Sequence, residues 1–208
     1  MSSRDEVLAR IRTALGTERA PVPEIVRDYR TTDERPAEEL LDVLVDRLED
    51  YKATVLRCTP GEIPATVVAA LDTGLPGGWA PADVVVAPGV PDPWRPAGTA
   101  EDDGRPAVEL ADFSATLVGV AVAIAETGTL VLDGSPLSGR RALSLLPDCL
   151  VCVVIADQVV GGVPEGLARL ERSAPLTMIS GPSATSDIEL SRVEGVHGPR
   201  TLVVVLVG

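Results

Sequence analysis

The chain has 208 residues, of which 45% are apolar and 24% charged, a balance that suits one folded domain and excludes a wholly disordered chain. Its formal net charge is −13, which would repel phosphate backbones and anionic lipids, so nucleic acid is excluded as a partner. No basic segment leads into an apolar one at the start, and no apolar run reaches about 18 residues. We therefore expect a cytoplasmic protein without membrane insertion.

The first predicted element is an amphipathic helix that is capped by a serine near its start and ends at Gly16. Residues 17–35 follow it without a sustained hydrophobic period. We expect residues 1–35 to form an N-terminal helix and linker that packs on the domain or on a partner subunit. Residues 36–208 are predicted to form one α/β domain.

Helical patterns and apolar runs alternate along this domain. Helices are predicted at about 37–50, 62–72, 138–146 and 163–172, and strands at 53–58, 83–87, 149–155, 176–179 and 202–207. A longer apolar block begins at Thr116, and the Pro- and Gly-rich residues 88–107 are predicted to be a long loop or flap. Because nearly every strand is continuously apolar, we predict a mainly parallel open sheet with helices on both faces.

A polar stretch interrupts the last apolar runs of the chain. The turn Gly181–Ser183 is predicted to lead from a strand into a short helix, at the carboxyl end of the sheet where open α/β folds bind ligands. Free backbone N–H groups there, with the hydroxyls of Ser183 and Thr185, would hold an anion. The alternative is an ordinary capped helix, with Ser183 or Thr185 as its cap and Asp187 or Glu189 complementing its dipole.

The only histidine of the chain, His197, lies in the segment GVHGPR that precedes the last strand. The two glycines around it and Pro199 predict a tight turn that holds His197 and Arg200 close together. His197 is a candidate catalytic residue and Arg200 a candidate ligand-binding residue, although a lone histidine is more often structural. No second histidine or chelating cysteine lies nearby, so a metal site is not expected.

A second polar segment, AETGT, separates two apolar runs. Its Glu126 would be costly to bury without a partner, so we expect an arginine or backbone N–H beside it, or a cleft. Glu126 is a candidate catalytic residue; the alternative is a strand-end turn in which it pairs with Arg140 or Arg141. The remaining candidate ligand-binding residues of this region are Thr127, Gly128, Thr129 and Arg140. We expect GVHGPR to bring His197 and Arg200 beside the GPS turn in one anion-binding corner, with AETGT as its opposite wall.

Cys149 and Cys152 form a C-x-x-C pattern, which in other settings binds zinc or an iron–sulfur cluster. Here they lie in a predicted strand, where residues three apart point to opposite faces, so their sulfurs would not converge. Cys58 is the only other cysteine. We expect no metal or cofactor to be bound by this chain.

Four patches resemble the LUD family in order and spacing. They are AIAETGTLVL, the Gly139-Arg140 pair followed by LSLLPD, GPSATSDIE, and GVHGPR before a terminal strand. The resemblance implies a sheet similar to that of the NagB/RpiA/CoA-transferase group. It also implies a role alongside iron–sulfur partner proteins in oxidising L-lactate to pyruvate, with the clusters on those partners.

The chain departs from the family pattern at two positions. Ala184 follows the GPS turn, where the family usually has an arginine, and Ala121 stands where an aspartate is frequent. Three functions therefore stay open: a non-redox subunit of a lactate-oxidising system, an independent CoA-transferase-like or ligase-like enzyme using Glu126, and a regulator that binds a small carboxylate or a phosphate-bearing ligand.

Overall fold

The structure is a computed structural model that describes residues 2–16, 23–171, 173–185, 193–195 and 198–208. Its main sheet has six strands, all parallel, and so confirms the predicted sheet type. In spatial order the strands are β1 (Thr54–Cys58), β12 (Thr201–Val207), β7 (Cys149–Ile155), β4 (Ala115–Gly119), β2 (Val84–Val86) and β3 (Ala100–Glu101).

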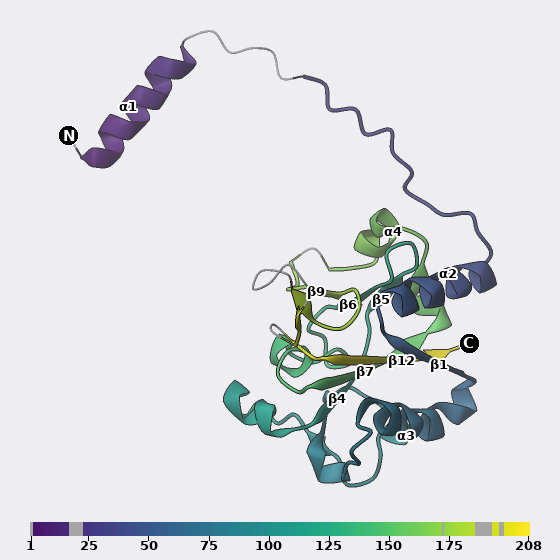
Figure 1. Ribbon diagram of the computed structural model, residues 1–208. Helices are drawn as coiled ribbons and strands as arrows, with labels where there is room; N and C mark the ends of the chain where they lie inside the picture. The colour runs from purple at the N-terminus through teal and green to yellow at the C-terminus, as the bar shows by residue number, and fades with distance from the viewer. Residues whose placement is uncertain (1, 17–22, 172, 186–192, 196–197) are drawn as a thin grey trace.

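Helical layers cover both faces of this sheet, as predicted (Figure 1). Helix α3 (Ile63–Gly74) packs on one face against β12, β7 and β1. Helix α2 (Ala37–Asp50) lies on the opposite face, where its apolar stripe buries Leu44 and Leu48 completely. The core between the layers is aliphatic: among the described residues, no aromatic side chain is fully buried. Valine fills both sides of the central strands, which explains their continuously apolar sequences.

A second sheet lies beside α2 on the same face (Figure 1). Its strands are β8 (Val159–Val160), β5 (Val122–Ile124), β6 (Thr129–Leu132) and β9 (Thr177–Ile179), in that spatial order. The apolar block after Thr116 is therefore divided among β4, β5 and β6, a division that the sequence analysis did not predict. The chain changes sheets at Val120 and Ala121, whose N–H groups donate to the carbonyls of Val153 in the main sheet and Val131 in the second. Because both sheets bury apolar residues, the hydrophobic pattern of the sequence does not show where the chain passes from one sheet to the other.

Three local predictions were wrong in extent or type. The segment 138–146 forms only a short 3-10 helix, Arg141–Ser144, and α4 is limited to Val163–Ala168. The Pro- and Gly-rich segment 88–107 is not wholly irregular, because it contributes β3 to the edge of the main sheet. Two residues are too few for a periodic signal. A last hairpin pairs β10 (Ala184–Thr185) with β11 (Val193–Glu194).

Helix α1 (Ser3–Leu15) lies apart from the rest of the chain and buries none of its residues (Figure 1). Its start is a capping box in which the Ser2 hydroxyl accepts from the N–H of Asp5, and the Asp5 carboxylate accepts from the N–H of Ser2. Its end is Gly16, at a φ of +67°, as the sequence predicted. Among the described residues, no helix combines the length and apolar character needed to cross a bilayer.

Candidate functional site

Glu126 lies in the turn of the β5–β6 hairpin, at the end of the second sheet. Its N–H donates to the carbonyl of Gly161 (3.1 Å), which continues the pairing of β5 with β8. Gly128 closes the turn at a φ of +55°, and its N–H donates to the carbonyl of Ala125 (3.2 Å). The turn thus presents the Glu126 side chain at the surface, where 38% of it is exposed.

Two arginines from the segment before α2 reach this carboxylate. Arg30 makes a direct ion pair with Glu126, and Arg35 lies 3.6 Å from the same oxygen. The arginine partner expected for Glu126 is therefore present, but it is not Arg140 or Arg141. The sequence analysis missed Arg30 and Arg35, because they lie in a linker without periodicity and nothing in the sequence indicates where that linker packs.

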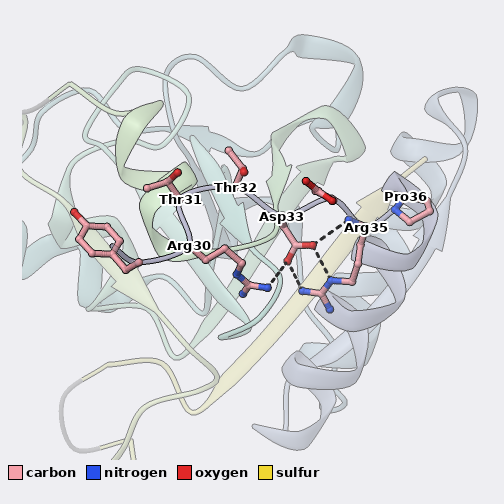
Figure 2. Close-up of a pocket in the computed structure, with 8 residues that line it drawn as sticks. Arg30, Thr31, Thr32, Asp33, Arg35 and Pro36 are labelled. Atoms are coloured by element: carbon pink, nitrogen blue, oxygen red, sulfur yellow. Dashed lines mark hydrogen bonds and ion pairs between the residues drawn. The ribbon is translucent and has the colours of Figure 1, made fainter. Parts of the chain in front are cut away.

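Asp33 lies between these two arginines and organises them (Figure 2). Its carboxylate, 3% exposed, accepts from Arg35 Nε (3.0 Å) and Nη2 (2.6 Å), and Arg30 Nη1 lies 3.6 Å away. The hydrogen bonds from Arg35 hold the pKa of the Asp33 carboxyl well below its usual range. The open cavity of about 740 Å³ along residues 29–36 is thus lined by guanidinium groups that already have carboxylate partners.

The segment that carries these residues is fixed to the domain by its backbone as well. The N–H of Asp33 donates to Glu165 Oε1 (3.2 Å), while Glu165 Oε2 accepts from the N–H groups of Gly161 (3.0 Å) and Gly162 (3.1 Å). A Cβ added at Gly161 would lie 2.1 Å from the Asp33 Cβ, so this approach requires glycine. We call residues Arg30–Arg35 the strap, because they cross the domain surface beside Glu126.

The residues that follow Glu126 contact α2 and the residue after β9. The hydroxyls of Thr127 and Thr129 lie 2.7 Å apart, and the Thr129 hydroxyl lies 2.8 Å from that of Ser180. Gly128 lies against α2, where a Cβ would stand 2.8 Å from the Arg47 Cβ. These hydroxyls and this glycine join the hairpin turn to its neighbours.

The GPS turn and the GVHGPR segment meet, as predicted, at a separate place. The N–H of Ser183 donates to the carbonyl of Pro199 (2.8 Å), and the N–H of Gly195 donates to the carbonyl of Ser183 (2.9 Å). Between this junction, the 3-10 helix and the first residues of β7 and β12 lies a cavity of about 310 Å³. We call it the Ser183 pocket. Its lining includes Gly181 and Ser183, and among the other lining residues are Arg141, Ser144, Leu145, Leu150, Ile179, Ala184, Gly198 and Leu202.

This position corrects two expectations. The Ser183 pocket lies at the amino ends of β7 and β12, because GVHGPR precedes β12, and not at the carboxyl end of the main sheet. Directly after the turn comes strand β10 rather than a helix N-terminus, and the Ser183 N–H is already bonded. The predicted helix near 186–191, with Asp187, lies outside the described residues, as do His197 and the side chain of Thr185.

The remaining predicted residues are engaged elsewhere. Arg140 makes a two-pronged contact with Asp102 (Nε 2.7 Å, Nη2 2.8 Å), which raises its pKa, and it also donates to the carbonyl of Arg105 (2.7 Å). It ties β3 and the loop after it to the start of the 3-10 helix. Arg200 is exposed, lies over Gly195 and approaches Asp148 (3.5 Å). The AETGT turn and the Ser183 pocket are therefore two places, linked through Ser180.

The cysteines do not form a metal-binding set. Cys149 and Cys152 are both buried in β7, and desolvation raises the pKa of the Cys149 thiol to about 12 and that of Cys152 further. Within the described ranges, no three His, Cys, Asp or Glu residues converge as metal ligands would. This part of the chain therefore offers no donor set for an iron–sulfur cluster.

The six-stranded parallel sheet with the added four-stranded sheet places this chain in the α/β class, and its sequence matches the LUD domain family model over residues 37–207. The chain belongs to the LUD domain family.

Three comparisons place it more closely. It is 41% identical to lactate utilization protein C of Deinococcus radiodurans over 98% of this chain and 94% of that protein. It is 34% identical to lactate utilization protein C 1 of Bacillus mycoides over 40% of this chain and 39% of that protein. A crystal structure of a DUF162 family protein from Deinococcus radiodurans superposes with a TM-score of 0.69 at 38% identity, covering 84% of this chain and 99% of that one. The resemblance drawn from the four sequence patches is confirmed.

Proposed function

We propose that this chain is a non-redox subunit of a system that oxidises L-lactate to pyruvate, and that it acts with iron–sulfur partner proteins. The observation that carries the proposal is the 41% identity to a lactate utilization protein C along nearly the whole of both chains. Oxidising lactate to pyruvate releases two electrons and two protons, so a carrier has to accept the electrons. Among the described residues, no three potential ligands converge to hold a metal cluster, which favours partner subunits as the carriers.

The structure gives less support to an independent enzyme that uses Glu126. A carboxylate acting as nucleophile or base needs a free lone pair directed at its substrate. In this structure Oε1 of Glu126 is paired with Arg30 and approached by Arg35, so that oxygen is already engaged in binding the strap. A role for Glu126 in holding the strap fits these contacts better.

Growth on L-lactate tests the proposal. A bacterial host whose own lactate utilization protein C is deleted should recover growth on L-lactate as sole carbon source when this chain is supplied. Affinity purification of the chain from the rescued cells should bring down iron-containing partner proteins. No rescue by a chain that accumulates in folded form would contradict the proposal.

Two variants separate a structural Glu126 from a reacting one. Glu126→Gln and Arg30→Gln both break the same ion pair, but only the first removes the carboxylate. For a non-redox subunit, the two variants should support growth equally. If Glu126→Gln abolished growth while Arg30→Gln retained it, Glu126 would be a catalytic residue and the independent-enzyme alternative would gain support.

A further inference from the structure

The lining of the Ser183 pocket combines charged, polar and apolar side chains. Arg141, at the start of the 3-10 helix, is charged, and Ser144 and Ser183 are polar. Leu145, Met178 and Ile179 are apolar lining residues that are at least partly exposed, whereas Leu150 and Leu202 lie almost completely buried beneath the pocket. A pocket of this composition suits a ligand with an ionic group at one end and a hydrocarbon body.

Arg141 differs from most arginines of the chain in its surroundings. Its neighbour Arg140 is fixed by Asp102, and Arg30 and Arg35 are held by carboxylates of the strap region. Within the part of the chain that the structure describes, no carboxylate lies within ion-pair distance of the exposed Arg141 guanidinium. In a protein with a net charge of −13, an arginine that lies beside a cavity and has no carboxylate partner among the described residues favours an anionic ligand.

The volume of the pocket bears on the size of that ligand. A volume of about 310 Å³ lies at the lower end of the range for small-molecule sites. Lactate and pyruvate have only three carbon atoms each and would leave part of this volume unfilled. A carboxylate that also contacts Leu145, Met178 and Ile179 needs a longer hydrocarbon chain.

We propose that the Ser183 pocket binds an aliphatic monocarboxylate larger than lactate, with its carboxylate at Arg141 and its hydrocarbon chain against Leu145, Met178 and Ile179. The site is separate from the strap and Glu126, since none of the strap residues lines it. The proposal goes beyond a role in lactate oxidation and does not depend on it. Binding is measured on the purified chain alone, so failure of this proposal and failure to support growth on lactate are separate results.

Isothermal titration of the full chain with straight-chain carboxylates from acetate to octanoate tests the proposal. We expect the affinity to rise about fourfold for each added methylene until the pocket is filled, because each buried methylene adds a constant increment. The alcohols of the same chain lengths should bind at least tenfold more weakly, since they lack the charge that pairs with Arg141.

Variants then locate the site. Arg141→Gln should weaken octanoate binding at least tenfold, and Arg141→Lys should weaken it less, because a lysine keeps the charge but not the planar fork. Arg12→Gln, which removes the same charge from α1, should leave binding unchanged and serves as the control. Affinity that is independent of chain length, or equal loss in Arg141→Gln and Arg12→Gln, would overturn the proposal.

Discussion

Asp33 and Gly161, which are 128 residues apart in sequence, lie so close that a Cβ on Gly161 would stand 2.1 Å from the Cβ of Asp33. The contact fixes the strap on the turn between β8 and α4, where Glu165 binds the backbone of both segments. It places Arg30 and Arg35 beside Glu126. The surroundings of Glu126 therefore depend on a contact between a short polar segment and a glycine.

The first prediction concerns this contact. Gly161→Ala should displace the strap, because a methyl group cannot occupy the position of the Asp33 Cβ. Limited proteolysis should then cleave the chain between residues 28 and 36 faster than in the unaltered protein. Gly162→Ala is the matched control, since a Cβ there would stand 3.5 Å from Glu126 Oε2, an ordinary contact. Equal protection of residues 28–36 in both variants would show that the strap does not rest on Gly161.

The second prediction concerns acid. The pKa of Asp33 is lower in the folded chain than in the unfolded one, where it is about 3.9. Its ionised form therefore stabilises the fold above that value, and this contribution is lost as the pH falls through the lower folded pKa. Asp33→Asn should lower the Tm at pH 7, and its difference from the unaltered protein should shrink steadily below about pH 4.

Thermal unfolding between pH 2 and pH 8 measures that difference. Asp148→Asn is the control, because the contact of the Asp148 carboxylate with Arg200 is long and exposed, and its loss should change the Tm little at any pH. If the difference in Tm between Asp33→Asn and the unaltered protein stayed constant from pH 2 to pH 8, an ionised and stabilising Asp33 would be contradicted.

The third prediction concerns the thiols. Burial raises the pKa of Cys149 to about 12 and keeps both β7 cysteines away from solvent, whereas Cys58 is only partly buried. A thiol reagent such as DTNB should titrate one group, Cys58, in the folded protein and all three in denaturant. Rapid reaction of three thiols without denaturant would mean that β7 is not the buried strand described here. Cys58→Ser should remove the fast-reacting group.

The sequence predicted the strands that are buried on both faces and the helix that has an amphipathic stripe, because both produce a recognisable hydrophobic pattern. The valine-rich runs gave β7 and β12 almost residue for residue, and α2 was predicted with its observed bounds. The second sheet was not predicted, because β4, β5 and β6 are equally apolar and read as one continuous run. Only the hydrogen bonds of Val120 and Ala121 show where the chain leaves one sheet for the other.

The sequence predicted individual segments of the candidate site, but it did not predict which segments lie together or at which end of the strands. The meeting of the GPS turn with GVHGPR was expected, and the bond from Ser183 to Pro199 confirms it. Its place at the amino ends of the strands was predicted wrongly, although a segment that leads into a parallel strand has to lie at that strand's amino end. The partners of Glu126 come from a segment about 90 residues earlier, and no local pattern encodes such a contact.

The last prediction concerns the contact between the GPS turn and the end of α2. Gly181 has a φ of +84°, and a Cβ there would stand 2.6 Å from the carbonyl oxygen of Tyr51. Gly181→Ala should therefore destabilise the fold through backbone strain and through a collision with the backbone. Gly78 offers a matched control, because its φ is +89° but a Cβ there would meet no atom within 4 Å. The loss of stability in Gly78→Ala should therefore come from backbone strain alone.

Urea unfolding of the two variants separates these contributions. Gly78→Ala should lower the free energy of unfolding by about 1–2 kcal/mol, the cost of a left-handed backbone for an alanine. Gly181→Ala should lower it further, because either the turn or Tyr51 has to move, and the excess measures how firmly the turn is held against α2. The Ser183 pocket begins at this turn, so a large excess would mean that one wall of the pocket is rigid before any ligand binds. Equal losses in the two variants would mean instead that the turn moves away from Tyr51 at little cost.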